Sequence, residues 1–253
     1  MRDAYILGGQ RIPFTKSMTH YMGLAPQELM TATLKSLVQK YQLQGLEIGD
    51  VQLGAVMKSS ADWGMARESV LGSGLSPLTP AADLQRACGT GLDAAITMAL
   101  RIRAGMIDSA IAGGVDTNSA LPIQFPASFS RKLLAAHAAK STGARIAAFL
   151  KMGISDFKPV LPAVKEPRTG MSMGEHCEKM VQEWGISRRD QDELTVRSHA
   201  AAAKAYAEGF HQDLISSFSG LEKDSLVRGD TSLEKLSKLK PAFERSEKGT
   251  LTA

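Results

Sequence analysis

The sequence has little cysteine: Cys88 and Cys177 are the only two among its 253 residues. Two cysteines do not make a disulfide framework in a chain of this length, which favours a reducing compartment. No apolar run approaches the roughly 18 residues that a membrane span needs, and the first residues lack the apolar core of a signal peptide. We therefore expect a cytoplasmic protein.

Aromatic residues are also scarce, at 6% of the chain, and the net charge is only +4. Because there is no RNA-binding aromatic signature, zinc-finger spacing or long basic run, we do not expect nucleic acid as a partner. The five histidines lack metal-ligand spacing, so no metal site is predicted. The small positive excess fits an anionic small ligand, and a chain of this length can bury a sizeable core.

Strand-like and helix-like segments alternate over the first 117 residues. The patterns predict strands over residues 5–7, 51–57, 81–85 and 110–115, and helices over 27–40, 63–71 and 88–104. This alternation favours an α/β fold in which a largely parallel sheet carries helices on both faces. In such folds the functional site lies at the carboxyl ends of the strands.

The character of the chain changes after Asn118. Residues 119–172 hold eight Lys or Arg against two acids, with five prolines and no strand alternation. This composition indicates the start of an inserted, loop-rich subdomain. Residues 131–151 are amphipathic, and we interpret them as a helix pair that covers the core or as a surface for a membrane or a partner. Further on, Ser187 to Asp190 resembles a capping box that opens a helix ending near Gly209.

Cys88 is the main candidate for chemistry. It lies where the extended segment 81–85 turns into a helix, and Gly89 and Gly91 follow it. The free N–H groups and the positive dipole end of a helix N-terminus favour a thiolate. This position predicts nucleophilic thiol chemistry, most naturally acyl transfer. We interpret Cys177 as a buried small residue, which is the usual role of an isolated cysteine.

A set of motifs, in order along the whole chain, resembles those of the thiolase family. The set comprises Arg11-Ile12-Pro13-Phe14, Ala66-Arg67 with residues 72–75, Arg86-Ala87-Cys88-Gly89-Thr90-Gly91, Gly113-Gly114, Met173-Gly174 with Glu178, the helix 187–210, and residues 238–243 and 249–253. Within the family, the sequence looks most similar to the 3-ketoacyl-CoA thiolases of fatty-acid β-oxidation, and in particular to the β subunits of trifunctional complexes.

The resemblance implies a thiolase-like αβαβα layered fold of class α/β. Residues 1–117 would form an incomplete first core half, residues 118–249 an inserted, mostly helical CoA-binding loop domain, and residues 250–253 the start of the return to the core. The rest of that half and a second αβ half would follow. The second half would carry the activating histidine, a second catalytic cysteine and part of an oxyanion hole, none of which has a counterpart here. We therefore expect little or no activity from this chain alone.

The implied reaction is thiolytic cleavage of a 3-ketoacyl-CoA by CoA through an acyl thioester on Cys88. Coenzyme A would be a substrate, and no separate cofactor is implied. By resemblance, CoA contacts would come from Ser172, Met173, Arg228, Leu239, Ala242 and Phe243. Of these, Arg228 would meet the adenine nucleotide, and Ser172 and Met173 would flank the pantetheine.

The expected partners are a second copy in a homodimer, a β-oxidation hydratase/dehydrogenase α subunit, or a separate C-terminal thiolase half. Two other functions remain open. One is a biosynthetic, acetoacetyl-CoA-forming thiolase or another condensing enzyme, although the inserted segment 119–172 argues against a synthase. The other is a non-catalytic module that binds acyl-CoA or lipid and does not acylate Cys88.

Overall fold

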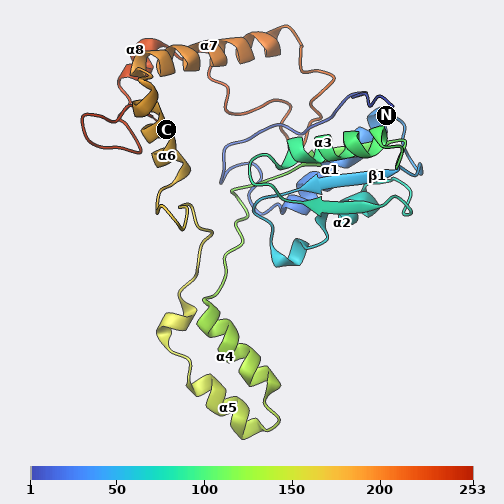
Figure 1. The fold of residues 1–253 in the computed structure, drawn as a ribbon, viewed down its shortest axis with the longest axis vertical. Helices are drawn as coiled ribbons and strands as arrows, with labels where there is room; N and C mark the ends of the chain where they lie inside the picture. Colours follow the sequence, from blue (N-terminus) through green and yellow to red (C-terminus); the bar gives the residue numbers. More distant parts are fainter. Residues whose placement is uncertain (1, 253) are drawn as a thin grey trace. The chain divides into compact units, whose positions relative to one another are not determined.

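The computed structural model describes residues 2–252 and divides the chain into two compact units (Figure 1). The larger unit combines Met1–Ala120 with Val164–Ala253, and the smaller unit is Leu121–Ala163. The smaller unit lies within the predicted loop domain of residues 118–249, whose role in CoA binding stays a prediction. No helix of the described residues is both long enough and apolar enough to cross a membrane.

Three parallel strands form the sheet of the larger unit, in the order β2-β1-β3. They are β1 (Asp50–Gly54), β2 (Ala81–Leu84) and β3 (Ala110–Gly114). Val51 in the central strand lies opposite Ala81 on one side and Ile111 on the other. The predicted parallel α/β architecture is therefore confirmed, and the second predicted strand ends at Gly54 rather than at residue 57.

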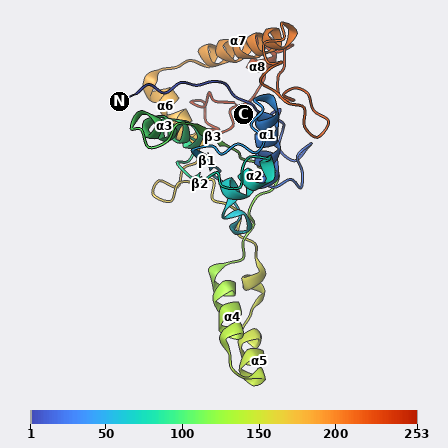
Figure 2. The ribbon, with the colours of Figure 1, turned by 90° about the vertical axis from the view of Figure 1, so that its right-hand side faces the viewer.

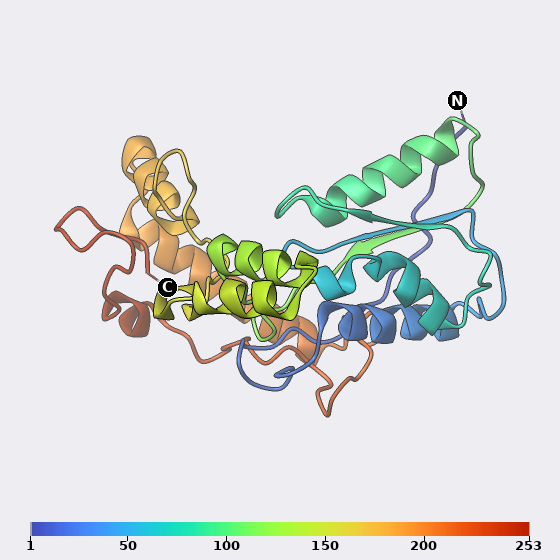
Figure 3. The ribbon, with the colours of Figure 1, turned by 90° about the horizontal axis from the view of Figure 1, so that it is seen from below.

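Helices cover both faces of this sheet, as Figure 3 shows. On one face lie α1 (Pro26–Lys40) and α2 (Met65–Ser73), the latter preceded by a short 3-10 turn, η1 (Ser60–Asp62), while α3 (Thr90–Arg103) lies on the other. The core forms between β1 and the first two helices, where the most deeply buried side chains are Leu34, Val38, Val51, Leu53, Met65, Ala66 and Val70. Gly74 ends α2 with a left-handed φ of 96°, which glycine adopts without strain.

The predicted first strand, residues 5–7, is wrong. Tyr5, Ile6 and Leu7 are 77%, 94% and 91% exposed, and no segment of residues 2–252 pairs with them. Three apolar residues in a row are a local signal, but a strand also requires a partner backbone that accepts its hydrogen bonds. Close to residues 5–7, the N-terminal part of the chain is anchored by Arg2, which binds the Ile102 carbonyl and the Asp108 carboxylate.

The chain beyond Val164 contributes α6 (Met173–Trp184), α7 (Arg188–Ala207) and α8 (Leu233–Ser237) to the larger unit. The predicted capping box at Ser187 is confirmed, because its hydroxyl accepts from the Asp190 N–H at 3.1 Å and opens α7. Helix α7 ends at Ala207, two residues before Gly209, which has a left-handed φ of 72°.

Glu178 joins α6 to the end of the described chain. Its side chain is 2% exposed and accepts from the Thr250 and Leu251 N–H groups at 2.9 and 2.8 Å. Burial alone would raise the pKa of Glu178, but these donors outweigh it and hold the pKa below its ordinary value. Nearby, the Phe243 ring lies against Gly174, and the Ala242 N–H donates to the Leu251 carbonyl at 2.9 Å. Three separate sequence motifs thus fold into one cluster.

The smaller unit is a helical hairpin of α4 (Ala127–Ala138) and α5 (Thr142–Leu150), followed by a 3-10 turn, η2 (Ile154–Phe157) (Figure 2). These helices are the pair predicted within residues 131–151. The rings of Phe125, Phe129 and Phe157 pack against one another, with neighbouring centroids 4.6 and 5.1 Å apart, and of the three Phe129 is the buried one.

Two polar contacts complete the smaller unit. The Lys132 ammonium lies 2.6 Å from Asp156, and this hydrogen bond, with that from the Gly153 N–H, lowers the pKa of Asp156 to about 2. Where the chain enters and leaves the hairpin, Gln124 and Val160 exchange backbone hydrogen bonds of 3.0 and 2.7 Å as an antiparallel pair. The hairpin is therefore tied at its base by backbone hydrogen bonds of its own.

Candidate active site

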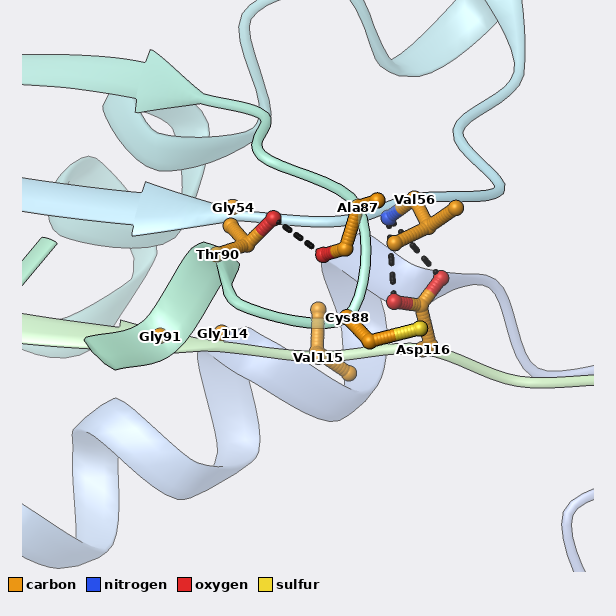
Figure 4. A pocket seen from close by; sticks show the side chains of 9 residues that line it. All are labelled: Gly54, Val56, Ala87, Cys88, Thr90, Gly91, Gly114, Val115 and Asp116. Atoms are coloured by element: carbon orange, nitrogen blue, oxygen red, sulfur yellow. Dashed lines mark hydrogen bonds between the residues drawn. The ribbon is translucent and has the colours of Figure 1, made fainter. Parts of the chain in front are cut away.

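The carboxyl ends of the three strands meet at an open pocket of about 270 Å³ (Figure 4). Cys88 follows β2, Val56 follows β1 and Asp116 follows β3. The remaining lining residues are Gly54, Ala87, Thr90, Gly91, Gly114 and Val115. The thiol of Cys88 is free and exposed, so the structure places the predicted nucleophile at the edge of the sheet where α/β folds carry their sites.

A tight turn between β2 and α3 presents Cys88. The N–H groups of Gly89 and Thr90 donate to the Arg86 and Ala87 carbonyls at 3.0 and 3.2 Å. The Thr90 hydroxyl donates to the Ala87 carbonyl at 2.7 Å and accepts from the Arg86 N–H at 2.8 Å. Ala87 has a left-handed φ of 43°, which costs a residue with a side chain about 1–3 kcal/mol. The chain thus holds strained backbone directly before Cys88.

Gly54 allows this turn to pack on the sheet. A β-carbon at position 54 would overlap the Leu84 carbonyl and the Thr90 side chain. Glycine at the end of β1 therefore lets the first turn of α3 approach the strand closely. That approach sets the distance of Cys88 from the strand ends.

Asp116 is a site residue that the sequence prediction missed. Its carboxylate accepts from the Val56 N–H at 3.0 Å and from the Met57 N–H at 2.8 Å, which ties the end of β3 to the end of β1. Figure 4 shows the carboxylate on the same side of the pocket as the Cys88 side chain. An acidic residue directly after a strand of a parallel sheet was the signal available in the sequence.

None of the described histidines lines the Cys88 pocket. His176, the one nearest in sequence to the Met-Gly motif, instead lies 3.0 Å from the Thr169 hydroxyl and 3.6 Å from Glu166. The Nδ1 atom of His199 accepts from the Arg228 N–H at 3.2 Å. Among residues 2–252, the side chains that line the pocket thus include a thiol but no imidazole.

The six residues predicted to contact CoA form two groups in the structure, one near α6 and one along α7. Ser172 caps α6, and its hydroxyl accepts from the Glu175 N–H at 3.3 Å; Met173 begins this helix and is 75% exposed. Phe243 and Ala242 lie in the cluster around Gly174 and Glu178 described above, so four of the six gather near α6. This grouping is compatible with the CoA assignment, which stays a prediction.

The other two lie along α7. The Leu239 carbonyl accepts from the Arg188 guanidinium at 3.1 Å at the start of α7, and Arg228 neighbours His199 near its middle. A cavity of about 500 Å³ opens at the start of α7, lined by Arg188, Arg189, Asp192, Leu233, Glu234 and Ser237. None of the six residues lines the Cys88 pocket.

Comparison with known proteins identifies the family. The sequence model of the family described as "Thiolase, N-terminal domain" matches residues 4–253. The chain belongs to the thiolase family. A 3-ketoacyl-CoA thiolase of Yersinia pestis (strain Pestoides F) is 36% identical over 98% of this chain and 58% of its own length, and one of Yersinia pseudotuberculosis serotype O:1b shows the same values.

The fold agrees with this membership. The crystal structure of the Bacillus anthracis acetyl-CoA acetyltransferase superposes with a TM-score of 0.79 and 26% sequence identity, covering 100% of this chain and 61% of that one. The thiolase-like layered fold expected from the motifs is confirmed. The chain spans somewhat more than half the length of the curated relatives that it matches.

Proposed function

We propose that this thiolase chain carries the nucleophile of a 3-ketoacyl-CoA thiolase, which cleaves its substrate with CoA into acetyl-CoA and an acyl-CoA two carbons shorter. One observation carries the proposal: Cys88 is exposed at the N-terminal end of α3, in the pocket where the three parallel strands end. The relatives named as 3-ketoacyl-CoA thiolases support the choice of substrate.

In this proposal the Cys88 thiolate attacks the 3-keto carbon, and the bond between C2 and C3 breaks. The electron pair stays on C2, which takes up a proton to become acetyl-CoA, while the acyl group remains on sulfur as a thioester. The CoA thiol then attacks the thioester, and Cys88 leaves as thiolate. Covalent catalysis of this kind divides one difficult step into two easier ones.

The oxyanion formed in each attack requires donors close to Cys88. The Cys88 N–H takes no part in the hydrogen bonds of the turn, which come from Gly89 and Thr90. We assign this N–H to the oxyanion, where one donor is typically worth 10²–10³-fold in rate. Gly91, in the first turn of α3, leaves open space for the substrate, since no atom lies within 4 Å of a β-carbon built there.

The general base and acid come from a segment outside residues 2–252, since no described histidine lines the pocket. Base assistance is typically worth 10²–10⁴-fold. We therefore propose that the chain alone has little or no thiolysis activity and that a second αβ half, in the same polypeptide or a separate one, completes the site.

The remaining assignments follow from this function. Ser172, Met173, Arg228, Leu239, Ala242 and Phe243 bind CoA, and the enzyme acts in cytoplasmic fatty-acid β-oxidation. It works as a homodimer, alone or with a hydratase/dehydrogenase α subunit. A second candidate is the acetoacetyl-CoA-forming reaction, which the likeness to an acetyl-CoA acetyltransferase favours.

Mass spectrometry of the chain after incubation with a 3-ketoacyl-CoA tests the nucleophile. We expect a mass increase equal to the shortened acyl group on the Cys88 peptide. It should be absent from Cys88→Ser and retained in Cys177→Ser, because Cys177 lies half-buried on α6. The reaction is repeated with the C-terminal half of a full-length relative added to supply the base. An adduct on Cys177, or none on Cys88 under either condition, would contradict the proposal.

A further inference from the structure

One face of α7 holds the turn that carries Arg228. The Nδ1 atom of His199 accepts from the Arg228 N–H at 3.2 Å. One helical turn later, Ala203 lies so close to Gly229 that a β-carbon added at position 229 would stand 3.0 Å from that of Ala203. The Arg228 carbonyl accepts from the Thr231 N–H at 3.2 Å, which closes the turn. The backbone of Arg228 is therefore fixed against α7.

The side chain of Arg228, by contrast, is free to bind a ligand. It is exposed, and its guanidinium makes no hydrogen bond or ion pair with any residue between 2 and 252. The acid nearest to it in sequence, Asp230, is paired with the Lys235 ammonium at 2.5 Å. A guanidinium presents several N–H donors in a fixed plane, which suits the oxygens of a phosphate. A held backbone with a free guanidinium therefore fits the recognition of an anionic group.

His199 can hold this turn only in its neutral form. Because Nδ1 accepts the Arg228 N–H, the ring proton is assigned to Nε2. In the imidazolium both nitrogens are donors, so Nδ1–H would point at another N–H. The contact that fixes the backbone of Arg228 would then be lost.

The charged groups around His199 add to this effect. Of residues 224–231, both acids are already in ion pairs, Asp224 with Arg11 and Asp230 with Lys235. The residues one turn away from His199 on α7 carry no charge: Thr195, Val196, Ala202 and Ala203. An imidazolium at position 199 would therefore place a second cation beside the unpaired Arg228.

We propose that neutral His199 is a positioning residue that presents Arg228 to the nucleotide phosphate of CoA, and that protonation of His199 weakens CoA binding. The proposal rests on the assignment of Arg228 to CoA under the proposed function. Histidine changes its charge between about pH 5 and 8, a range in which arginine, lysine and aspartate at ordinary sites keep theirs. CoA affinity should therefore report the protonation of this one contact.

Calorimetric titration of the full chain with CoA at pH 8 tests the acceptor. His199→Leu, which removes it, should weaken binding roughly threefold to tenfold, the value of one neutral hydrogen bond. His199→Asn retains an oxygen acceptor close to the position of Nδ1 and should bind within about twofold of wild type. His20→Leu is the matched control, since His20 is an exposed histidine outside this turn, and it should leave binding unchanged. Circular dichroism checks that each variant is folded.

The same titrations between pH 8 and 5 test the protonation. CoA carries a phosphate that itself titrates near pH 6, so wild type is compared with His199→Asn at each pH. The asparagine amide does not titrate, and wild type should lose affinity relative to this variant as pH falls, approaching His199→Leu at pH 5. A constant ratio of the two affinities would overturn the proposal. So would a relative gain of wild type on acidification, because the imidazolium would then bind the phosphate directly.

Arg228→Ala separates this proposal from the function on which it rests. We expect CoA binding about tenfold weaker, the value of a hydrogen bond to a charged group. If Arg228→Ala weakens binding and His199→Leu does not, only the positioning role fails. If Arg228→Ala has no effect, the assignment of Arg228 to CoA is wrong and the role of His199 fails with it.

Discussion

Gly174 lies so close to the ring of Phe243 that a β-carbon at position 174 would overlap the ring. The contact joins the first turn of α6 to the chain near its end, and Glu178 one turn later binds the Thr250 and Leu251 N–H groups. Glycine is a poor helix former, about 1 kcal/mol worse than alanine. Its presence inside α6 therefore reflects the space that Phe243 occupies.

Gly174→Ala should destabilise the larger unit by about 1–3 kcal/mol, the usual cost of overpacking, in spite of the gain in helix propensity. Urea unfolding followed by far-UV circular dichroism measures this change, since α6 and α5, which carries the control, are both helical. The matched control is Gly143→Ala in the first turn of α5, where no atom lies within 4 Å of the added carbon. That variant should be neutral or slightly more stable. Equal changes in the free energy of unfolding for the two variants would mean that the contact with the Phe243 ring does not affect stability.

Arg11→Lys should show that the bidentate pair with Asp224 holds the N-terminal segment. The two guanidinium nitrogens lie 2.7 and 2.9 Å from the carboxylate oxygens, and both side chains are mostly buried. Lysine keeps the charge but loses the paired geometry, so we expect a loss of about 1–3 kcal/mol in thermal or urea unfolding.

Arg2→Lys is the control for that measurement. Arg2 also lies 2.6 Å from a carboxylate, that of Asp108, but the two side chains are 44% and 90% exposed. Exposed pairs contribute roughly 0–1 kcal/mol. A cost at Arg2 as large as that at Arg11 would mean that burial is not what makes the Arg11 pair strong.

Asp156→Asn should destabilise the smaller unit in a pH-dependent way. The pKa of Asp156 is lowered to about 2 by Lys132 and the Gly153 N–H, against about 3.9 in an unfolded chain. A carboxylate with a lowered pKa stabilises the fold fully above the unfolded value, and this contribution is lost as pH falls from about 4 through 2. The variant lacks the contribution at every pH.

Hydrogen exchange of the α4 amides measures this effect, with wild type and variant compared at each pH. We expect stronger protection of the wild type at pH 5–6 and a difference that shrinks towards pH 2. Asp108→Asn, an exposed acid of the larger unit, should leave the exchange of α4 unchanged. A difference that stayed constant down to pH 2 would refute the role of the ionised carboxylate.

Local patterns were sufficient to predict β1, β2, β3 and the helices between them. Hydrophobic spacing, capping residues and glycines determine the structure of residues close to them in the chain. Their effect can therefore be predicted from a short stretch of sequence. Cys88 could be placed at a strand end for the same reason. Residues 5–7 show the limit of this approach: their apolar run is local, but pairing depends on a partner backbone that no part of the described chain supplies.

Contacts between distant residues could not be predicted in this way. Asp116 and Val56 are 60 residues apart, and nothing in either neighbourhood indicates their hydrogen bond. The same holds for Glu178 and Thr250, which the resemblance marked as parts of two motifs without joining them. Such pairs are set by topology, which brings strand ends together regardless of separation along the chain.

The hydrogen bonds between Gln124 and Val160 have a consequence for how the chain tolerates change. Because a reciprocal antiparallel pair holds two α-carbons about 5.5 Å apart, the path into the hairpin and the path out of it run through one narrow neck. A two-residue turn spans such a gap. The hairpin is thus a self-contained insertion. In a chain lacking residues 125–159, a short turn could connect Gln124 to Val160 while the rest of the chain keeps its course, and a different segment could be inserted at the same place.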